Sequence, residues 1–275
     1  MNVKRPNSRR NLDIAIDRIF GTEQNLIQIR TILANTIVGQ LLPGGVVKGG
    51  SSLKFRYGDK TTRFTRDFDT ARAEELDIFL EQLSKSLHDG WNGFNGRLVT
   101  KSPPSPKGIP GEYIMKPFEV KLAYMGKSWV TIPLEIGHNE IGDADSCDYY
   151  ISPEITRLFV ELGFPKPNPL PLMQIHHQIA QKLHALSFSE SERAHDLIDL
   201  QLIAKHEEID YALTKVTCKR LFDYRKQQQW PPTVTEGKSW SSLYAAQVNE
   251  LDVMSNVSDA VVWVNGFIEK INNEI

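Results

Sequence analysis

The residues with the clearest capacity for chemistry lie between positions 49 and 69. A Gly49-Gly50-Ser51 turn is followed, after a short polar and basic segment, by Asp67-Phe68-Asp69. Glycine lets the backbone approach a phosphate closely, and a hydroxyl and backbone N–H groups can hydrogen-bond its oxygens. Aspartates at i and i+2 of a strand point to the same face, where they can hold hard divalent cations together. A phosphate loop with paired carboxylates indicates chemistry on nucleotides.

Composition sets limits on the partners. The 275 residues are 40% hydrophobic and 24% charged, as in an ordinary globular protein. The formal net charge of −2 gives no general attraction to nucleic acid or anionic membrane, so a nucleic-acid partner would need a local basic patch. Cys147 and Cys218 are too few and too far apart for a disulfide framework or a zinc site, which favours a reducing cytoplasm.

Targeting signals are not predicted. The basic first ten residues have no apolar stretch directly behind them, which argues against a signal peptide. No run approaches the roughly 18 apolar residues that cross a bilayer. We therefore expect no membrane association.

Hydrophobic periodicity predicts alternating elements in the first half. Apolar residues at three- and four-residue steps predict helices over 22–42 and 72–88, and a short helix is expected over 51–57. Val46 and Val47 read as a short buried strand leading into the glycines. Residues 64–70 read as the next strand, with Phe68 pointing to the core and the two aspartates away from it.

A hairpin is predicted after a loop rich in glycine and proline. Residues 91–111 are expected to be loop, whereas residues 118–124 and 130–136 alternate apolar and polar side chains around a turn at Gly126. On the second strand this alternation places Glu135 on the polar face.

The second half reads as helical. Residues 165–171 resemble a proline-rich linker, and helices are expected over 172–187, 190–205, 207–229, 239–252 and 257–273. The fold prediction is an N-terminal α/β domain at residues 1–150 followed by an all-α domain at residues 151–275.

The order of these features resembles the nucleotidyltransferase superfamily with a DNA polymerase β-like palm. That pattern is a helix, a strand, Gly-Ser, Asp-x-Asp and a third carboxylate on a later strand. The resemblance implies an α+β palm domain with a small mixed sheet.

Two motif blocks resemble the AbiEii/AbiGii-type toxin family in particular. Residues 48–53 (KGGSSL) and 63–69 (RFTRDFD) are similar to the family's KGGTAL and RxSxDxD. Residues 181–186 (QKLHAL) and 193–200 (RAHDLIDL) are similar to its EKLxAL and RDxxDL. Gln181 stands where the family has Glu, and His195 where it often has Arg, with Arg193 two residues earlier. The resemblance covers residues 25–205.

The resemblance implies a metal site in the first domain. Asp67 and Asp69 are expected to be catalytic and to bind two Mg²⁺ ions, with Glu135 completing the site. Glu119, on the neighbouring strand, is the alternative third carboxylate.

It also implies nucleotide-binding residues in both domains. Gly50, Ser51 and Ser52 are expected to hold the phosphates. Lys182 is expected to neutralise the triphosphate, with Asp196 or Asp199 orienting it. For Arg193, a phosphate contact and a surface ion pair are equally open.

Other polar residues receive a structural interpretation. We interpret Lys48 and Arg66 as solvated flanks of the motifs. His176, His177, His184 and His195 are expected to be helical surface residues, because their spacing matches no metal motif.

The implied biology is a toxin–antitoxin pair. The expected partners are a nucleoside triphosphate, a tRNA whose 3′ end is extended in some relatives, and a separately encoded antitoxin of winged-helix type. An alternative is a nucleotidyltransferase that modifies a protein or a small molecule. A further alternative is a catalytically inactive nucleotide-binding regulator, which the intact Asp67, Asp69 and Lys182 disfavour.

Overall fold

The chain divides into two compact units. The computed structural model describes residues 4–21, 26–102 and 114–274. Unit 1 comprises Met1–Asp59, Phe64–Asn139 and Ala144–Leu172, and unit 2 comprises Lys60–Arg63, Glu140–Asp143 and Met173–Ile275. The main division therefore falls after residue 172, and not after residue 150 as expected, because the segment after residue 150 returns to the sheet of unit 1.

Unit 1 is built on a seven-stranded mixed sheet of order β3-β4-β5-β2-β1-β7-β6. The strands are β1 Val46–Lys48, β2 Phe68–Arg72, β3 Phe94–Thr100, β4 Lys116–Tyr124, β5 Lys127–His138, β6 Cys147–Tyr150 and β7 Leu170–Met173. Strand β2 runs parallel to β5, and β1 runs parallel to β7. The predicted hairpin is the antiparallel pair β4–β5. This mixed sheet confirms the α+β class predicted for the first half.

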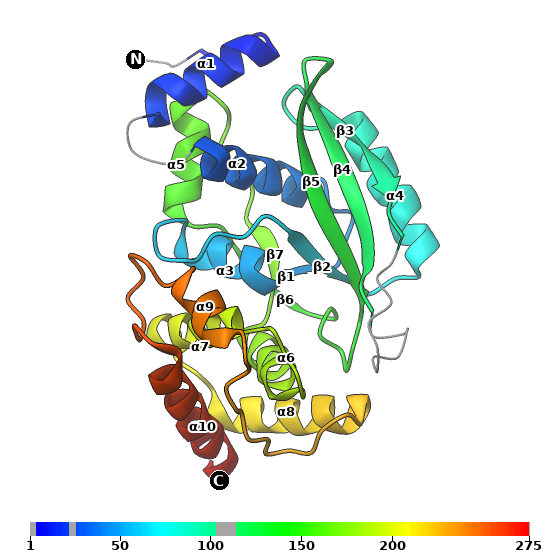
Figure 1. Ribbon diagram of the computed structural model, residues 1–275. Helices are drawn as coiled ribbons and strands as arrows, with labels where there is room; N and C mark the ends of the chain where they lie inside the picture. Colours follow the sequence, from blue (N-terminus) through cyan, green and yellow to red (C-terminus); the bar gives the residue numbers. More distant parts are fainter. Residues whose placement is uncertain (1–3, 22–25, 103–113, 275) are drawn as a thin grey trace. The chain divides into compact units, whose positions relative to one another are not determined.

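Helices pack against this sheet to form one hydrophobic core. They are α1 Arg9–Phe20, α2 Leu26–Gln40, α3 Gly49–Tyr57, α4 Leu76–Asp89 and α5 Pro153–Glu161. Buried apolar side chains of all five helices join Phe68, Val120 and Leu134 of the strands in a single cluster. Helix α4 lies beside β3, as Figure 1 shows. The residues that alternate with these core positions consequently point to the other face of the sheet.

Unit 2 is helical, as predicted. Its helices are α6 Ile175–Ser187, α7 His195–His206, α8 Tyr211–Arg225, α9 Trp240–Ala245 and α10 Val257–Asn273. Helix α6 packs against α7 and α8, and α10 packs against α7, α8 and α9. Side chains of Asp210 and Asn256 cap α8 and α10 by accepting a backbone N–H. Among the helices of the described residues, none has the length and apolar character of a membrane-crossing helix.

Several local predictions were wrong. Strand β3 occupies part of the expected loop 91–111, and β7 occupies the end of the expected linker. Both are stabilised by pairing with another strand, β3 with β4, the next strand along the chain, and β7 with β1, far earlier in the chain. Strand β2 begins at Phe68, four residues later than expected. Helix α1 was not predicted. The prolines at 103–106 lie outside the described residues.

Candidate active site

Two carboxylates stand side by side on the sheet of unit 1. Asp69 of β2 and Glu135 of β5 are direct partners in the register of these neighbouring parallel strands. Neighbouring strands lie about 4.8 Å apart, so the two side chains start from adjacent positions. Phe68 and Leu134 point into the core, and the partly buried Asp69 and Glu135 share the opposite face. We call this face, with Asp67 at its edge, the acidic face.

Asp67 precedes the strand. It is exposed and lies immediately before β2, which begins at Phe68, whereas Asp69 is the second residue of that strand. The Oγ of Ser51 donates a hydrogen bond of 2.6 Å to the backbone carbonyl of Asp67. This bond ties the first turn of α3 to the chain segment that carries the carboxylate.

The backbone of the glycine turn lies against the carboxylate of Asp69. Gly49 has a φ of +62°, and a Cβ built there would lie 2.3 Å from Oδ2 of Asp69. Only glycine satisfies both conditions, because a side chain would be strained and would collide with the carboxylate. Gly50, Ser51 and Ser52 are buried in the first turn of α3. The predicted phosphate loop is therefore a helix N-terminus placed next to the acidic face.

The structure separates the two candidates for the third carboxylate. Glu135 is the direct neighbour of Asp69, whereas Glu119 lies one strand further away, opposite Pro133. Oε1 of Glu119 is 3.0 Å from Nζ of Lys101, and this hydrogen bond is the main cause that lowers the pKa of Glu119. The register therefore favours Glu135.

The carboxylates suit a hard cation by their chemistry. Asp67, Asp69 and Glu135 offer only oxygen donors, which Mg²⁺ prefers. Within the ranges that the structure describes, no three His, Cys, Asp or Glu side chains are gathered as a metal cluster. The donor set fits the metal, and its assembly into a site stays a prediction.

Unit 2 contains a buried network of charges centred on Lys182 of α6. Its Nζ lies 2.8 Å from Oδ1 of Asp196 and 2.6 Å from Oδ2 of Asp199, both on α7. All three residues are buried. The two aspartates lie at i and i+3 and so share a face of α7. The predicted contact between Lys182 and one aspartate is a contact with both.

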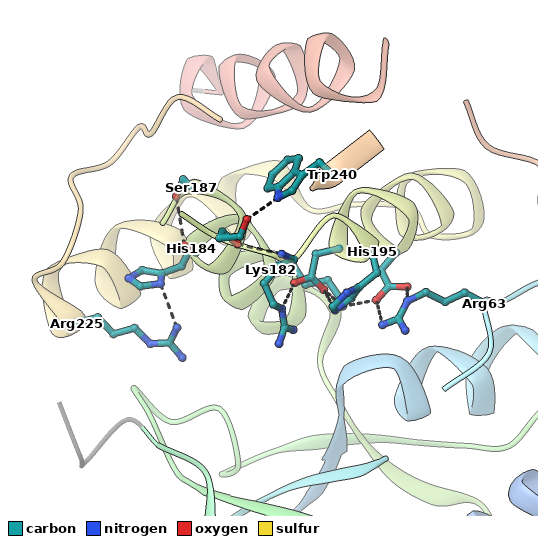
Figure 2. Close-up of polar contacts among 11 residues, drawn as sticks. Arg63, Lys182, His184, Ser187, His195, Arg225 and Trp240 are labelled. Carbon is teal, nitrogen blue, oxygen red and sulfur yellow. Dashed lines mark hydrogen bonds and ion pairs between the residues drawn. The ribbon is translucent and has the colours of Figure 1, made fainter. Parts of the chain in front are cut away.

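Arg63 completes this network, and the sequence reasoning assigned it no role. Its Nε and Nη2 donate to Oδ1 and Oδ2 of Asp199 at 2.8 and 2.9 Å, a bidentate pair. Figure 2 shows Arg63 and Lys182 directed at the same group of α7 side chains. Arg63 is the first residue of the RFTRDFD motif, so its position in this motif could have indicated a functional role for it.

Arg193 and His195 lie at the edge of the network. Arg193 is about half exposed, and its Nε lies 2.8 Å from Oδ2 of Asp196. Nε2 of His195 lies 3.9 Å from Oδ1 of Asp196, and three quarters of the His195 side chain is shielded from solvent. Burial lowers the pKa of His195 to about 4, so the imidazole is neutral at pH 7.

Electrostatics keep both aspartates ionised. Burial alone would raise the pKa of Asp199, yet Arg63 and Lys182 lower it to about 2. Arg193 and Lys182 likewise hold the pKa of Asp196 well below its ordinary value against the effect of burial. For Arg63, burial acts to lower the pKa, but the charge and hydrogen bonding of Asp199 and the charge of Asp196 together outweigh it, and the pKa is raised. The network therefore contains three cationic and two anionic side chains at neutral pH.

Comparison with known proteins found a matching family model and similar solved structures. The family model described as nucleotidyl transferase AbiEii toxin, type IV TA system, matches residues 31–259. The solved structure of MenT4, a nucleotidyltransferase toxin from Mycobacterium tuberculosis H37Rv, is 17% identical with a TM-score of 0.54 and covers 94% of this chain and 97% of MenT4. JHP933 from Helicobacter pylori is 16% identical with a TM-score of 0.45, covering 90% and 91%. No curated protein matches the sequence.

Proposed function

Because the chain belongs to the AbiEii family of nucleotidyltransferase toxins from type IV toxin–antitoxin systems, we propose that it transfers a nucleoside monophosphate from a nucleoside triphosphate to an acceptor hydroxyl. We place the reaction on the acidic face of unit 1. The observation that carries this proposal is the register of Asp69 with Glu135, next to the glycine turn that begins α3.

The reaction needs positioning and charge stabilisation. A bond forms between the acceptor oxygen and the α-phosphorus, the bond from this phosphorus to the pyrophosphate oxygen breaks, and the hydroxyl proton leaves to solvent. Protein groups accelerate such a step by holding the reactants in line and by stabilising negative charge on the phosphate oxygens. The first turn of α3, with Gly50, Ser51 and Ser52, directs backbone N–H groups that suit phosphate oxygens.

We propose Mg²⁺ as the cofactor, held by Asp67, Asp69 and Glu135. When bound, it would lower the pKa of the attacking hydroxyl and offset charge on the triphosphate. The support for this assignment is the oxygen-only donor set and the adjacency of Asp69 and Glu135. The Oγ of Ser51 donates a hydrogen bond to the main-chain carbonyl of Asp67, which holds this segment beside the first turn of α3 and supports including Asp67 in the proposed site.

For unit 2 we propose a role in holding the triphosphate. Arg63, Lys182 and Arg193 share the two carboxylates of Asp196 and Asp199, so the network has an excess of one positive charge. An excess charge with fixed geometry suits a polyanionic ligand. Lys182 supplies its charge while Asp196 and Asp199 position it, and the half-exposed Arg193 is the member nearest to solvent.

The identity of the acceptor and of the protein partner is proposed from the family resemblance alone. We propose the 3′ end of tRNA as the acceptor, a cytoplasmic site of action, and a separately encoded winged-helix antitoxin as the partner. Because the net charge is −2, RNA must be held by a local basic surface, and its affinity should fall steeply with salt.

A labelling experiment tests the proposal. Purified protein is incubated with Mg²⁺ and each of the four nucleoside triphosphates, labelled at the α-phosphate, in the presence of total tRNA or of cell extract. We expect label in RNA with one preferred nucleotide. Label in protein or in a small molecule would identify a different acceptor, and nucleotide binding without pyrophosphate release would indicate the inactive regulator. Asp69→Asn is the matched inactive control.

A further inference from the structure

Lys48 lies on the acidic face of unit 1 and not in solvent as its sequence context suggested. It ends β1, where its direct partner on β2 is Asp69, and only 8% of it is exposed. A Cβ built on Gly137 of β5 would lie 3.0 Å from Nζ of Lys48. The lysine side chain therefore reaches across β2 to β5, on the face that carries Asp69 and Glu135.

Among the described residues, no ion pair with an N···O distance of 4.0 Å or less involves the ammonium of Lys48. The other buried lysines differ. Lys54 pairs with Asp59, and Lys182 pairs with two aspartates. Burial of an unpaired charge is strongly unfavourable unless a partner compensates it. A largely buried lysine without a direct ion pair, next to the glycine turn that begins α3, is therefore a candidate ligand-binding group.

Space for this ammonium is provided by the sheet itself. Gly137 has no side chain, and any Cβ there would press on Nζ and Cε of Lys48. On the other side, the turn at Gly49 holds the carboxylate of Asp69 close to the backbone that follows Lys48. Gly137 therefore leaves room for the end of the lysine side chain, and Gly49 leaves room for the neighbouring carboxylate of Asp69.

We propose that Lys48 binds a phosphate oxygen of the nucleoside triphosphate on the acidic face. This proposal rests on the proposed function and adds a substrate-binding residue to it. An anionic ligand suits this position, because a cation next to Nζ would be repelled. A charge-assisted N–H···O⁻ hydrogen bond to phosphate then compensates the buried charge.

The test compares two buried lysines. Lys48→Met keeps the length of the side chain and removes the charge, and Lys54→Met is the matched control, since Lys54 has a protein counterion in Asp59. Without ligand, we expect Lys48→Met to melt at or above the wild-type temperature, whereas Lys54→Met should melt lower because it leaves Asp59 unpaired. A melting temperature of Lys48→Met that falls as far as that of Lys54→Met overturns the proposal, because Lys48 is then structural.

Ligand binding provides the second readout. Inorganic tripolyphosphate binding, measured by calorimetry, should weaken about 10- to 100-fold in Lys48→Met, the usual scale for one charged hydrogen bond, and recover in part in Lys48→Arg. Gly137→Ala should give an intermediate loss because it displaces only the flexible end of the lysine. Wild-type affinity in Lys48→Met overturns the proposal. Because tripolyphosphate binding requires no acceptor, it tests Lys48 even if the wild-type protein transfers no nucleotide.

Kinetics separate two sources of the phosphate. If the bound group belongs to the nucleotide, Lys48→Met raises KM for the nucleoside triphosphate and leaves KM for tRNA unchanged. The reverse pattern would assign Lys48 to the RNA backbone and overturn the assignment to the nucleotide.

Discussion

Asp199→Asn probes the buried network of unit 2 most directly. The carboxylate of Asp199 accepts two hydrogen bonds from Arg63 and one from Lys182, at 2.8, 2.9 and 2.6 Å. An asparagine oxygen in the place of Oδ2 can keep two of these bonds. Its amide nitrogen then faces Nε of Arg63, so two donors oppose each other, and both cations lose the charge that compensated them.

The expected loss of folding stability is large because these side chains are almost inaccessible to water. The side chains of Asp199 and Lys182 are 2% and 5% exposed, and that of Arg63 is 11% exposed. Removing one member of a buried ion pair costs about 3–5 kcal/mol. At about 2–4 °C per kcal/mol for a chain of this size class, the Tm should fall by roughly 6–20 °C. Asp196→Asn should cost less, because Arg193 is about half exposed and can turn to water.

The control is an ion pair of the same length on the surface. Lys85 Nζ lies 2.8 Å from Oδ2 of Asp89, with side chains 78% and 57% exposed. Asp89→Asn should leave the Tm unchanged within error, since exposed pairs contribute little. Thermal and urea unfolding of the three variants, followed by circular dichroism, measures the series. If Asp199→Asn melts within error of Asp89→Asn, burial does not decide the energetics of this network and the reasoning is wrong.

Three further predictions concern the acidic face and pH. Glu135→Gln should abolish nucleotide transfer, whereas Glu119→Gln, a matched change one strand further from Asp69, should retain it in the same labelling assay; equal losses would contradict the choice of Glu135. Gly49→Ala should lower both stability and activity, because φ is +62° and the new Cβ would lie 2.3 Å from Oδ2 of Asp69; a stable, fully active variant would show that this turn does not position the carboxylate. Burial lowers the pKa of His195 to about 4, and burial with the charge of Arg225 lowers that of His184 to about 3, from an ordinary 6.5. The unfolded chain therefore binds these protons first, and the free energy of unfolding should decrease as the pH falls below about 6.5. Urea unfolding between pH 7 and 5 measures this decrease, which His195→Gln should reduce and which a flat profile would refute.

The sequence by itself determined the class of the fold and the chemistry of its motifs. Periodicity is a local property, so the helices of the second half and the β4–β5 hairpin could be predicted from it. The motifs at 48–53, 63–69, 181–186 and 193–200 indicated the family that the family model matches. Alternation along one strand was enough to place Glu135 on the polar face of β5.

Only the tertiary structure decided which residues meet. Strands β3 and β7 exist because other strands pair with them, and the four-residue β7 pairs with β1, far earlier in the chain, so no local pattern encodes that pairing. The sequence favoured Glu135 and left Glu119 as the alternative, because the strand register that sets the neighbour of Asp69 is not a local property. Arg63 meets Asp199, 136 residues later, and Lys48 becomes largely buried opposite Asp69, because burial and ion pairing depend on segments far apart in the chain.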